Sequence, residues 1–203
     1  MLYSYKMTDD TGFAPNPFHG ILSLATCKPF IREKKGINTY IAGFTSKELC
    51  DEEVGKERLV YIMRITEKLN FNKYYSDQRF ECKIPSNDNR ISKVGDNIYF
   101  FNDGKYTQGF SYFHRDKANI ANDLKSDQVL LSDDFFYWGI GAISIDNFRI
   151  RIPKTQARHG VKTVDENEIQ RLWKYLEANF EKNLLIHHPH VWEENEPFNT
   201  EDV

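Results

Sequence analysis

The first segment of this sequence with a chemical character is a polar loop from Asp9 to Gly20. Two glycines, two prolines and an asparagine within it restrict its backbone to a specific path. Rigid loops of this kind commonly present side chains and backbone N–H groups to a ligand. We expect Asp9 to take part in proton transfer, and Thr11 and Asn16 to contact a substrate. The alternative is a structural loop folded over its own two phenylalanines.

A second polar group follows the apolar segment 21–26 and extends to Arg32. Cys27 lies beside Lys28, and nearby cations favour the thiolate that makes a cysteine nucleophilic. Lys28 and Arg32 could bind a phosphate group through charge-assisted hydrogen bonds. The residues thus predict a catalytic Cys27 with substrate-binding Lys28 and Arg32. A small buried cysteine between two solvated bases is the alternative.

Three further groups carry side chains that suit acid–base chemistry or substrate binding. Asp77 could transfer a proton, and Arg79 beside it could hold a phosphate. Gln108 and His114 could read the polar edge of a base or position a water, and His114 is a second candidate for proton transfer. Arg158 precedes the late helix, whose N-terminus attracts anions, although a simple surface loop is equally consistent with that position.

Aromatic residues form 14% of the chain, which raises the question of whether some of them bind a base. Stacking on a base contributes ~1–3 kcal/mol in proteins that bind single strands. Packing in a core or barrel is the alternative. Tyr137 and Trp138 are the predicted contacts to substrate, within a possible aromatic cage formed by Tyr99, Phe100, Tyr106, Phe136, Tyr137 and Trp138.

Known metal and cofactor motifs are absent from the sequence. It contains no phosphate-binding GxxxxGK[ST], no dinucleotide-binding GxGxxG, no HExxH and no GxSxG. His187, His188 and His190 surround Pro189, which prevents the helix that would align two ligands, so we predict no metal site. The identity of any cofactor stays open. Three cysteines without CxxC spacing indicate reduced thiols and a cytoplasmic location.

The elements that must position these residues are mainly short strands. Apolar and alternating patterns predict strands, and aromatic residues on both sides of Asp103–Gly104 indicate a hairpin that turns there. The Asp133–Asp134 pair is expected to cap a short helical turn. Apolar residues at three- and four-residue spacing predict a helix over 165–183. The expected strands cover 2–6, 21–26, 38–46, 58–66, 96–103 and 104–114, with a short helix over 71–80.

This pattern predicts an α+β fold in one domain, residues 1–186, followed by an acidic tail, residues 187–203. The sheet is expected to be curved and mixed or antiparallel, with a C-terminal helix. A chain of 203 residues buries enough surface to need no disulfide. No apolar run approaches ~18 residues, and the first residues lack an apolar signal region, so we expect no membrane partner. A net charge of −3 favours small-nucleotide binding over tight, sequence-independent DNA binding.

The segment from Tyr3 to Arg32, YSYKMTDDTGFAPNPFHGILSLATCKPFIR, resembles the start of the nucleotide modification associated domain family, second type. The resemblance covers about Leu2 to Lys162 and includes IAGFTS, RLVYIMRITEKL, DQRF with KIP, GDNIYF and VLLSDDFFYWG. It implies a role in making, processing or sensing modified nucleotides or DNA in phages and bacterial conflict systems. It supplies no demonstrated reaction. The segment KVGDNIYF is also similar to turns in PUA- and EVE-like barrels, which read modified bases, so a partly closed barrel is one form the sheet could take.

Three functions are consistent with these observations. The first is an enzyme of unknown reaction type that acts on a nucleotide or on a base in DNA, and we favour it because of the polar side chains above. The second is a reader without catalytic activity that binds a modified base in an aromatic pocket. The third is an assembly subunit of a DNA-modification or phage-conflict system.

Overall fold

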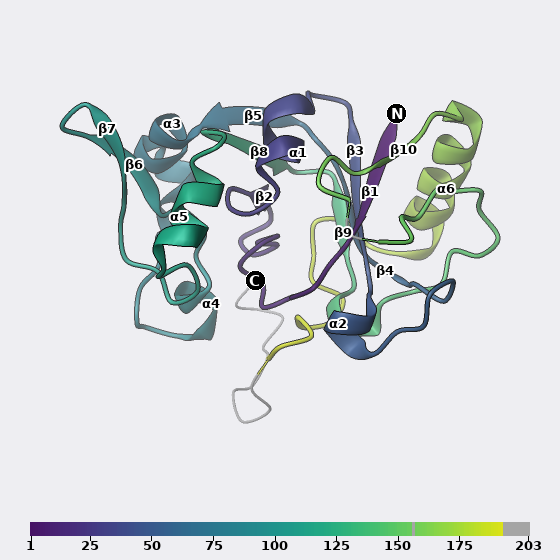
Figure 1. Cartoon of the computed structure of the whole chain (residues 1–203). Coiled ribbons are helices and arrows are strands. Elements are labelled where there is room, and N and C mark those ends of the chain that lie inside the picture. The colour runs from purple at the N-terminus through teal and green to yellow at the C-terminus, as the bar shows by residue number, and fades with distance from the viewer. Residues whose placement is uncertain (156, 193–203) are drawn as a thin grey trace.

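The structure, a computed structural model, describes residues 1–155 and 157–192 and shows an α+β fold with three sheets (Figure 1). In the largest sheet β1 and β3 are parallel and the other neighbours antiparallel, so the sheet is mixed. None of the sheets in the described part of the chain closes into a barrel. The predicted α+β class is therefore confirmed in its open form. The strand order is β10 (Val161–Thr163), β1 (Leu2–Lys6), β3 (Tyr40–Phe44), β4 (Leu59–Arg64) and β9 (Phe135–Tyr137).

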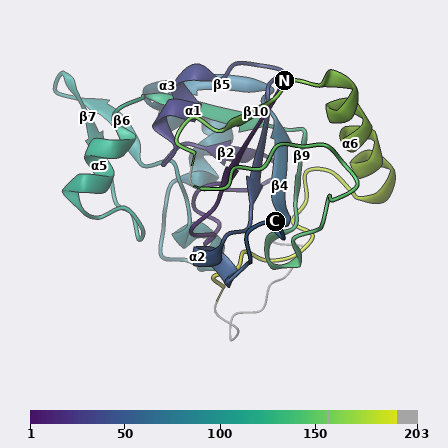
Figure 2. The same ribbon diagram turned by 45° about the vertical axis from the view of Figure 1, so that its right-hand side comes forward.

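Both faces of the five-stranded sheet are buried. Side chains alternate between these faces along each strand, and each face is covered by other elements. One face packs against helix α6 (Glu166–Asn179), which lies along the outside of the sheet (Figure 2). The carboxylate of Asp165 begins α6 by accepting hydrogen bonds from the N–H groups of Asn167 and Glu168. The predicted C-terminal helix is thus present and ends four residues before the predicted end. Its contact with the sheet is made by Ile169, Leu172, Trp173 and Leu176.

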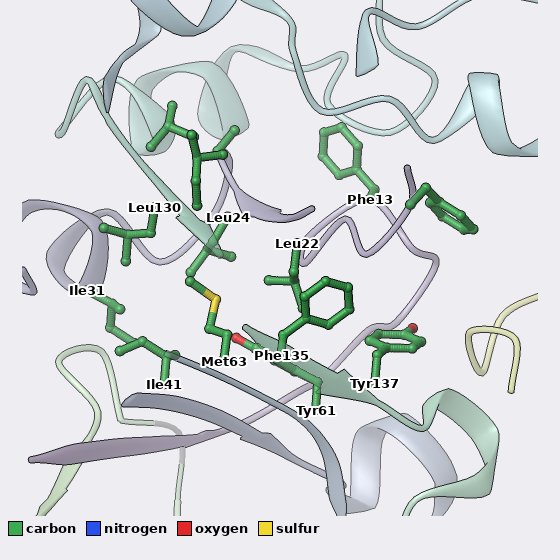
Figure 3. Close-up of a cluster of buried hydrophobic side chains, with 14 of the residues drawn as sticks. Phe13, Leu22, Leu24, Ile31, Ile41, Tyr61, Met63, Leu130, Phe135 and Tyr137 are labelled. Carbon is green, nitrogen blue, oxygen red and sulfur yellow. The ribbon is translucent and has the colours of Figure 1, made fainter. Parts of the chain in front are cut away.

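The opposite face of this sheet packs against a three-stranded sheet of β2 (Leu22–Leu24), β8 (Gln128–Ser132) and β5 (Glu67–Asn70). Figure 3 shows part of this cluster, in which Leu24 lies near Met63. Helices α1 (Pro29–Lys34) and α3 (Phe71–Ser76) contact β8. The main core thus lies between two sheets, and β2 leaves this core directly toward the segment that holds Cys27.

Beyond the two packed sheets lies the hairpin of β6 (Tyr99–Asn102) and β7 (Lys105–Gln108), at the left of Figure 1. Its turn is at Asp103–Gly104, as predicted, and both residues adopt the left-handed backbone that a tight hairpin turn requires. Among the described residues the remaining helices are short. They are α2 (Lys47–Cys50), η1 (Gln78–Lys83), α4 (Arg90–Lys93), α5 (Lys117–Asp123) and η2 (Gly139–Gly141).

The predicted helical turn at Asp133–Asp134 is wrong. These residues connect β8 to β9 instead, because each strand continues into a ladder with a different sheet. Asp134 then serves as an ion-pair partner, with its carboxylate 2.5 Å from Arg64 Nε and 2.7 Å from Lys182 Nζ.

Part of the predicted tail is fixed to the first loop. The backbone N–H of His190 and its Nδ1 lie 3.1 Å and 2.8 Å from Oδ2 of Asp10. The N–H of Val191 donates to the Asp10 carbonyl at 2.9 Å. Residues 193–203 lie outside the described part of the chain, and the predicted boundary after residue 186 stays a prediction. No helix in the described residues is long and apolar enough to cross a membrane.

Candidate functional site

Cys27 occupies a tight turn between the end of β2 and the start of α1. Both Cys27 and Lys28 have positive φ angles, 54° and 37°, in a region that residues other than glycine rarely adopt. Two hydrogen bonds hold the turn. The Cys27 N–H donates to Oδ1 of Asp123 at 2.7 Å, and the Cys27 carbonyl accepts from Nε of Arg32 at 2.8 Å. Such backbone conformations cluster at functional sites, where surrounding contacts impose them.

The side chains of Cys27, His114 and Asp123 form a linear series. Nε2 of His114 lies 3.5 Å from the Cys27 sulfur, and Nδ1 of the same ring lies 2.6 Å from Oδ2 of Asp123. The C-terminal end of α5 carries Asp123 to the turn between β2 and α1 (Figure 1). A nucleophile, a base and a carboxylate that orients the base are the arrangement by which enzymes activate cysteine and serine.

A second layer of hydrogen bonds fixes the acid and the histidine. The Tyr99 hydroxyl lies 2.9 Å from Oδ2 of Asp123 and 3.0 Å from Oε1 of Gln108. The hydroxyl has only one proton to donate, and the charged carboxylate of Asp123 is a stronger acceptor than the amide oxygen of Gln108. Nε2 of Gln108 donates to the His114 carbonyl, and the His114 N–H donates to Oγ of Ser111 at 3.2 Å. The Asp123 carboxylate and the backbone of His114 are therefore both held in place by the residues around them.

His114 carries a proton at neutral pH. Burial lowers the pKa of His114, but the hydrogen bonds to Asp123 and Cys27 outweigh burial and raise the pKa of His114 to about 10. A protonated imidazole beside a sulfur stabilises negative charge on it, and the thiolate is the nucleophilic form of cysteine.

The same three side chains have donor atoms within 4.8 Å of one another, a spacing that a metal ion could also use. Their orientation favours the catalytic series. A bound metal needs donors that point to one centre, whereas the two ring nitrogens of His114 face different partners. The Asp123 carboxylate already lies within hydrogen-bond distance of the Cys27 N–H, the Tyr99 hydroxyl and His114.

The sulfur of Cys27 faces a cavity of about 530 Å³, within the range of about 300–1,000 Å³ typical of small-molecule sites. Its wall combines aromatic rings, amides and cations with a single carboxylate among the lining residues. The aromatic rings are Tyr5, Phe13, Phe30 and Phe113, the amides are Asn119 and Asn122, the cations are Lys28, Lys125 and Arg158, and the carboxylate is Asp9.

The cations of the cavity wall are available to an anionic ligand. Within residues 1–155 and 157–192, no carboxylate lies within 4.0 Å of Lys28, Lys125 or Arg158. Nζ of Lys28 lies 4.5 Å from the centre of the Tyr5 ring. Burial lowers the pKa of Lys28, while the negative charge of Cys27 opposes that shift. A phosphate would supply the counter-charge that these side chains lack.

The family model for nucleotide modification associated domain 2 matches residues 1–196. The chain belongs to this family. No curated protein and no solved structure matches it. The resemblance found in the sequence is confirmed, and membership in this family indicates a role associated with nucleotide modification.

Six of the residues predicted from sequence line one cavity. Asp9 and Thr11 reach it from the first loop, and the other members come from three separate segments. Desolvation and the neighbouring Asp10 raise the pKa of Asp9, against a backbone hydrogen bond and the charge of His114. The roles predicted for these six residues stay predictions, but all six lie at the same cavity. The six are Asp9, Thr11, Cys27, Lys28, His114 and Arg158.

Three predicted polar residues lie away from the cavity. Arg79 forms exposed ion pairs with Asp77 and Glu67, at 2.7 Å and 2.9 Å from its guanidinium nitrogens. Neither Asp77 nor Arg79 lines the cavity, because both lie at the start of η1, where their side chains face solvent and pair with each other. Asn16 is buried and binds Nζ of Lys83 through its side-chain oxygen at 2.6 Å. Its amide is therefore used inside the protein.

Four other predicted substrate contacts are also absent from the cavity wall. Tyr137 and Trp138 are almost fully buried in the two cores on opposite faces of the large sheet, because consecutive residues of a strand point to opposite faces. The hydroxyl of Tyr137 donates to Asp10 at 2.6 Å. Arg32 is fully buried behind Cys27, and Gln108 supports the His114 backbone.

Asp123 is the member of the series that sequence reasoning missed. It is fully buried at the last residue of α5, where a helix dipole opposes a negative charge. That unfavourable position becomes visible only once α5 is known, so the sequence carried no signal for Asp123. The sequence around it, KANIAND, has too few apolar residues for helical periodicity to mark α5.

Proposed function

We propose that this protein is a cysteine-dependent enzyme that modifies or processes a nucleotide or a nucleotide base. The observation that carries the proposal is the series Cys27–His114–Asp123 at the wall of a cavity, with 3.5 Å from sulfur to Nε2 and 2.6 Å from Nδ1 to the carboxylate. Membership in a family associated with nucleotide modification supports the substrate class.

The series supports a two-step transfer. The Cys27 thiolate attacks an electrophilic carbon of the substrate and forms a carbon–sulfur bond. The leaving group departs with its bonding electrons and takes the proton of His114. The neutral imidazole then accepts a proton from a second nucleophile, water or an acceptor molecule, which attacks the same carbon and releases the thiolate. Asp123 keeps the ring in one orientation through both steps.

The cavity wall supports a nucleotide as the substrate. Lys28, Lys125 and Arg158 provide charge for a phosphate, and the aromatic rings offer flat faces for a base. A reader without catalytic activity would use the same rings and cations. It would have no need of an oriented nucleophile, so the Cys27 series favours the enzyme.

Mass spectrometry tests the enzyme against the reader. The wild-type protein is incubated with a panel of nucleotides and single-stranded oligonucleotides, and both the substrates and the intact protein are analysed. We expect a substrate-derived adduct on Cys27 and a new product. Cys27→Ala should abolish both, lowering turnover by more than about 10⁴-fold.

Cys82→Ser is the matched control, since Cys82 is an exposed thiol outside the cavity wall. It should leave adduct and product unchanged. Binding of a panel member without adduct or product, unaffected by Cys27→Ala, would support the reader and contradict the enzyme.

A further inference from the structure

Arg32, in the last turn of α1, is a fully buried cation that has no ion-pair partner among the described residues. Its guanidinium donates four hydrogen bonds, and every acceptor is a backbone carbonyl. No carboxylate in the described part of the chain lies within 4.0 Å of it. The acceptors are the carbonyls of Cys27 at 2.8 Å, Ser126 at 2.8 Å, Gln128 at 2.7 Å and Asp123 at 2.7 Å.

An unpaired buried charge of this kind is unfavourable. Arginine is almost never fully buried unless it is paired, and desolvation of an ion has a penalty of several kcal/mol. Carbonyl dipoles satisfy four of the five N–H groups of Arg32 but leave its net charge in place. Burial lowers the pKa of Arg32, and the nearby charges of Asp123 and Cys27 oppose that shift. A retained charge at this position therefore requires negative charge nearby.

Two of the four carbonyls belong to the proposed catalytic series. Arg32 bonds to the carbonyl of Cys27 and to the carbonyl of Asp123, which are 96 residues apart in the chain. The Cys27 N–H binds the Asp123 side chain as well. Cys27 is thus held on its N–H by the acid and on its carbonyl by the guanidinium, which together fix its left-handed backbone.

We propose that Arg32 is a positioning residue for Cys27, and that the Cys27 thiolate is part of the counter-charge that balances this buried cation. The proposal rests on the proposed function, in which the thiolate is the reactive form. Arg32 does not line the cavity, so it acts on the substrate only through Cys27.

Other charged and titratable groups also face the Cys27 side chain. His114 and Lys28 lie on the cavity side, Asp123 lies behind His114, and the hydroxyls of Tyr5 and Tyr99 lie close enough to interact with the sulfur's charge. Lys28 and His114 border the cavity, where solvent screens them. Arg32 is sealed from solvent, so its field acts on the sulfur at low dielectric.

Alkylation of Cys27 by iodoacetamide between pH 5 and pH 10 tests the proposal without any substrate. The variants are Arg32→Met, which removes the charge, and Arg32→Lys, which keeps the charge but loses the planar set of donors. We expect Arg32→Met to move the pH midpoint of alkylation upward by about one pH unit, which lowers the rate near pH 6 about tenfold. Arg32→Lys should keep the midpoint near that of the wild type but lower the limiting rate at high pH, because the turn is held less firmly.

Lys83→Met is the matched control, since Lys83 is another fully buried cation whose hydrogen bonds lie outside the cavity wall. It should lower stability without moving the midpoint. Thermal unfolding confirms that each variant is folded, and Arg32→Lys decides the test if Arg32→Met does not fold. The proposal would be overturned if the folded Arg32 variants alkylated Cys27 with the same pH midpoint and the same limiting rate as the wild type. Failure of the proposed function gives a different result, namely binding without adduct or product, or product formation that survives Cys27→Ala.

Discussion

Two buried polar networks lie close together along β2 and its continuation, and they differ in what surrounds them. The first is centred on Lys83 and includes Ser23 of β2 itself. The second is centred on Cys27, which follows the same strand. Both contain a buried cation, a buried carboxylate and a tyrosine hydroxyl. Buried charge alone therefore does not separate a structural network from a catalytic one.

The Lys83 network is closed. Nζ of Lys83 donates to Oδ1 of Asn16 at 2.6 Å and to Oγ of Ser23 at 3.1 Å. Ser23 and Tyr74 each donate to Asp96 at 2.8 Å. Burial lowers the pKa of Lys83 to about 8, against the opposing charge of Asp96. None of these residues lines the cavity that Cys27 borders.

The Cys27 network differs in three respects. It contains a nucleophile, its backbone adopts a left-handed conformation at two successive residues, and its sulfur and imidazole border a cavity. It also lies beside cations that have no carboxylate partner among the described residues. The comparison indicates that reactive groups at a cavity wall, rather than perturbed buried groups in general, mark the site.

The largest difference between the networks should appear in catalysis. His114→Ala removes the proposed proton carrier and should lower turnover by about 10²–10⁴-fold, as expected for a general acid or base. Turnover measured on the product found by mass spectrometry checks this. Lys83→Met should retain turnover at a temperature where it is folded. A comparable loss in both variants would remove the distinction between the networks.

The next effect concerns stability and falls on the closed network. Lys83→Met removes the hydrogen bonds to Asn16 and Ser23 and the positive charge that acts on the buried Asp96 carboxylate, which should reduce the free energy of unfolding by about 3–5 kcal/mol. Urea unfolding measures the change. Cys27→Ala, in the open network, removes one small half-buried side chain and should change the free energy of unfolding by about 1 kcal/mol. Equal losses would contradict the assignment of Lys83 to a structural role.

Stability should also depend on pH through His114. Its pKa is raised in the folded protein, so its stabilisation is complete below the unfolded value of about 6.5 and is lost as pH rises toward the folded value. The experiment uses Cys27→Ala, because ionisation of the thiol would also change the pH dependence of the free energy of unfolding and would obscure the contribution of His114. Asp123 still raises the pKa of His114 in that variant.

In Cys27→Ala the free energy of unfolding should fall by up to about 1.4 kcal/mol per pH unit above pH 6.5. Adding His114→Gln should flatten this slope. A slope that persists in the double variant would assign the pH dependence to other groups.

The last comparison concerns the two tyrosine hydroxyls, and the effect of Tyr99→Phe on turnover should be the smallest. The variant removes the hydroxyl that donates to Asp123 at 2.9 Å but keeps the ring that packs on Phe71. A hydrogen bond to a charged acceptor contributes about 1.5–3 kcal/mol, and turnover should fall less than in His114→Ala. Tyr74→Phe, which removes the equivalent bond to Asp96, should cause a similar loss of stability with unchanged turnover. Loss of turnover in Tyr74→Phe would contradict the separation of the structural network from the proposed catalytic one.

Features with a strong local pattern were predictable from the sequence. The apolar spacing of α6 and the Asp103–Gly104 turn each depend on residues within one short segment, and both are present as predicted. Local backbone preferences decide these features, so one sequence is enough to predict them.

The proposed catalytic series was not predictable as a unit. Its members are 87 and 96 residues from Cys27, and the short helices α1 and α5 that align them lack a periodic apolar face. Tyr137 and Trp138 were predicted to contact substrate, but both are buried, because a large sheet covered on both faces buries consecutive aromatic residues. Tertiary packing decides both outcomes.

The most direct test of the central claim uses the three cysteines of the chain as each other's controls. Cys82 is exposed, whereas Cys27 and Cys50 are half-buried. The protein is treated at pH 6 with less than one equivalent of iodoacetamide, and peptide mass spectrometry measures the modified fraction of each cysteine. If His114 and its partners activate Cys27, it should react at least about tenfold faster than Cys82 despite its lower exposure. Modification in the order of exposure, with Cys82 first, would contradict the account.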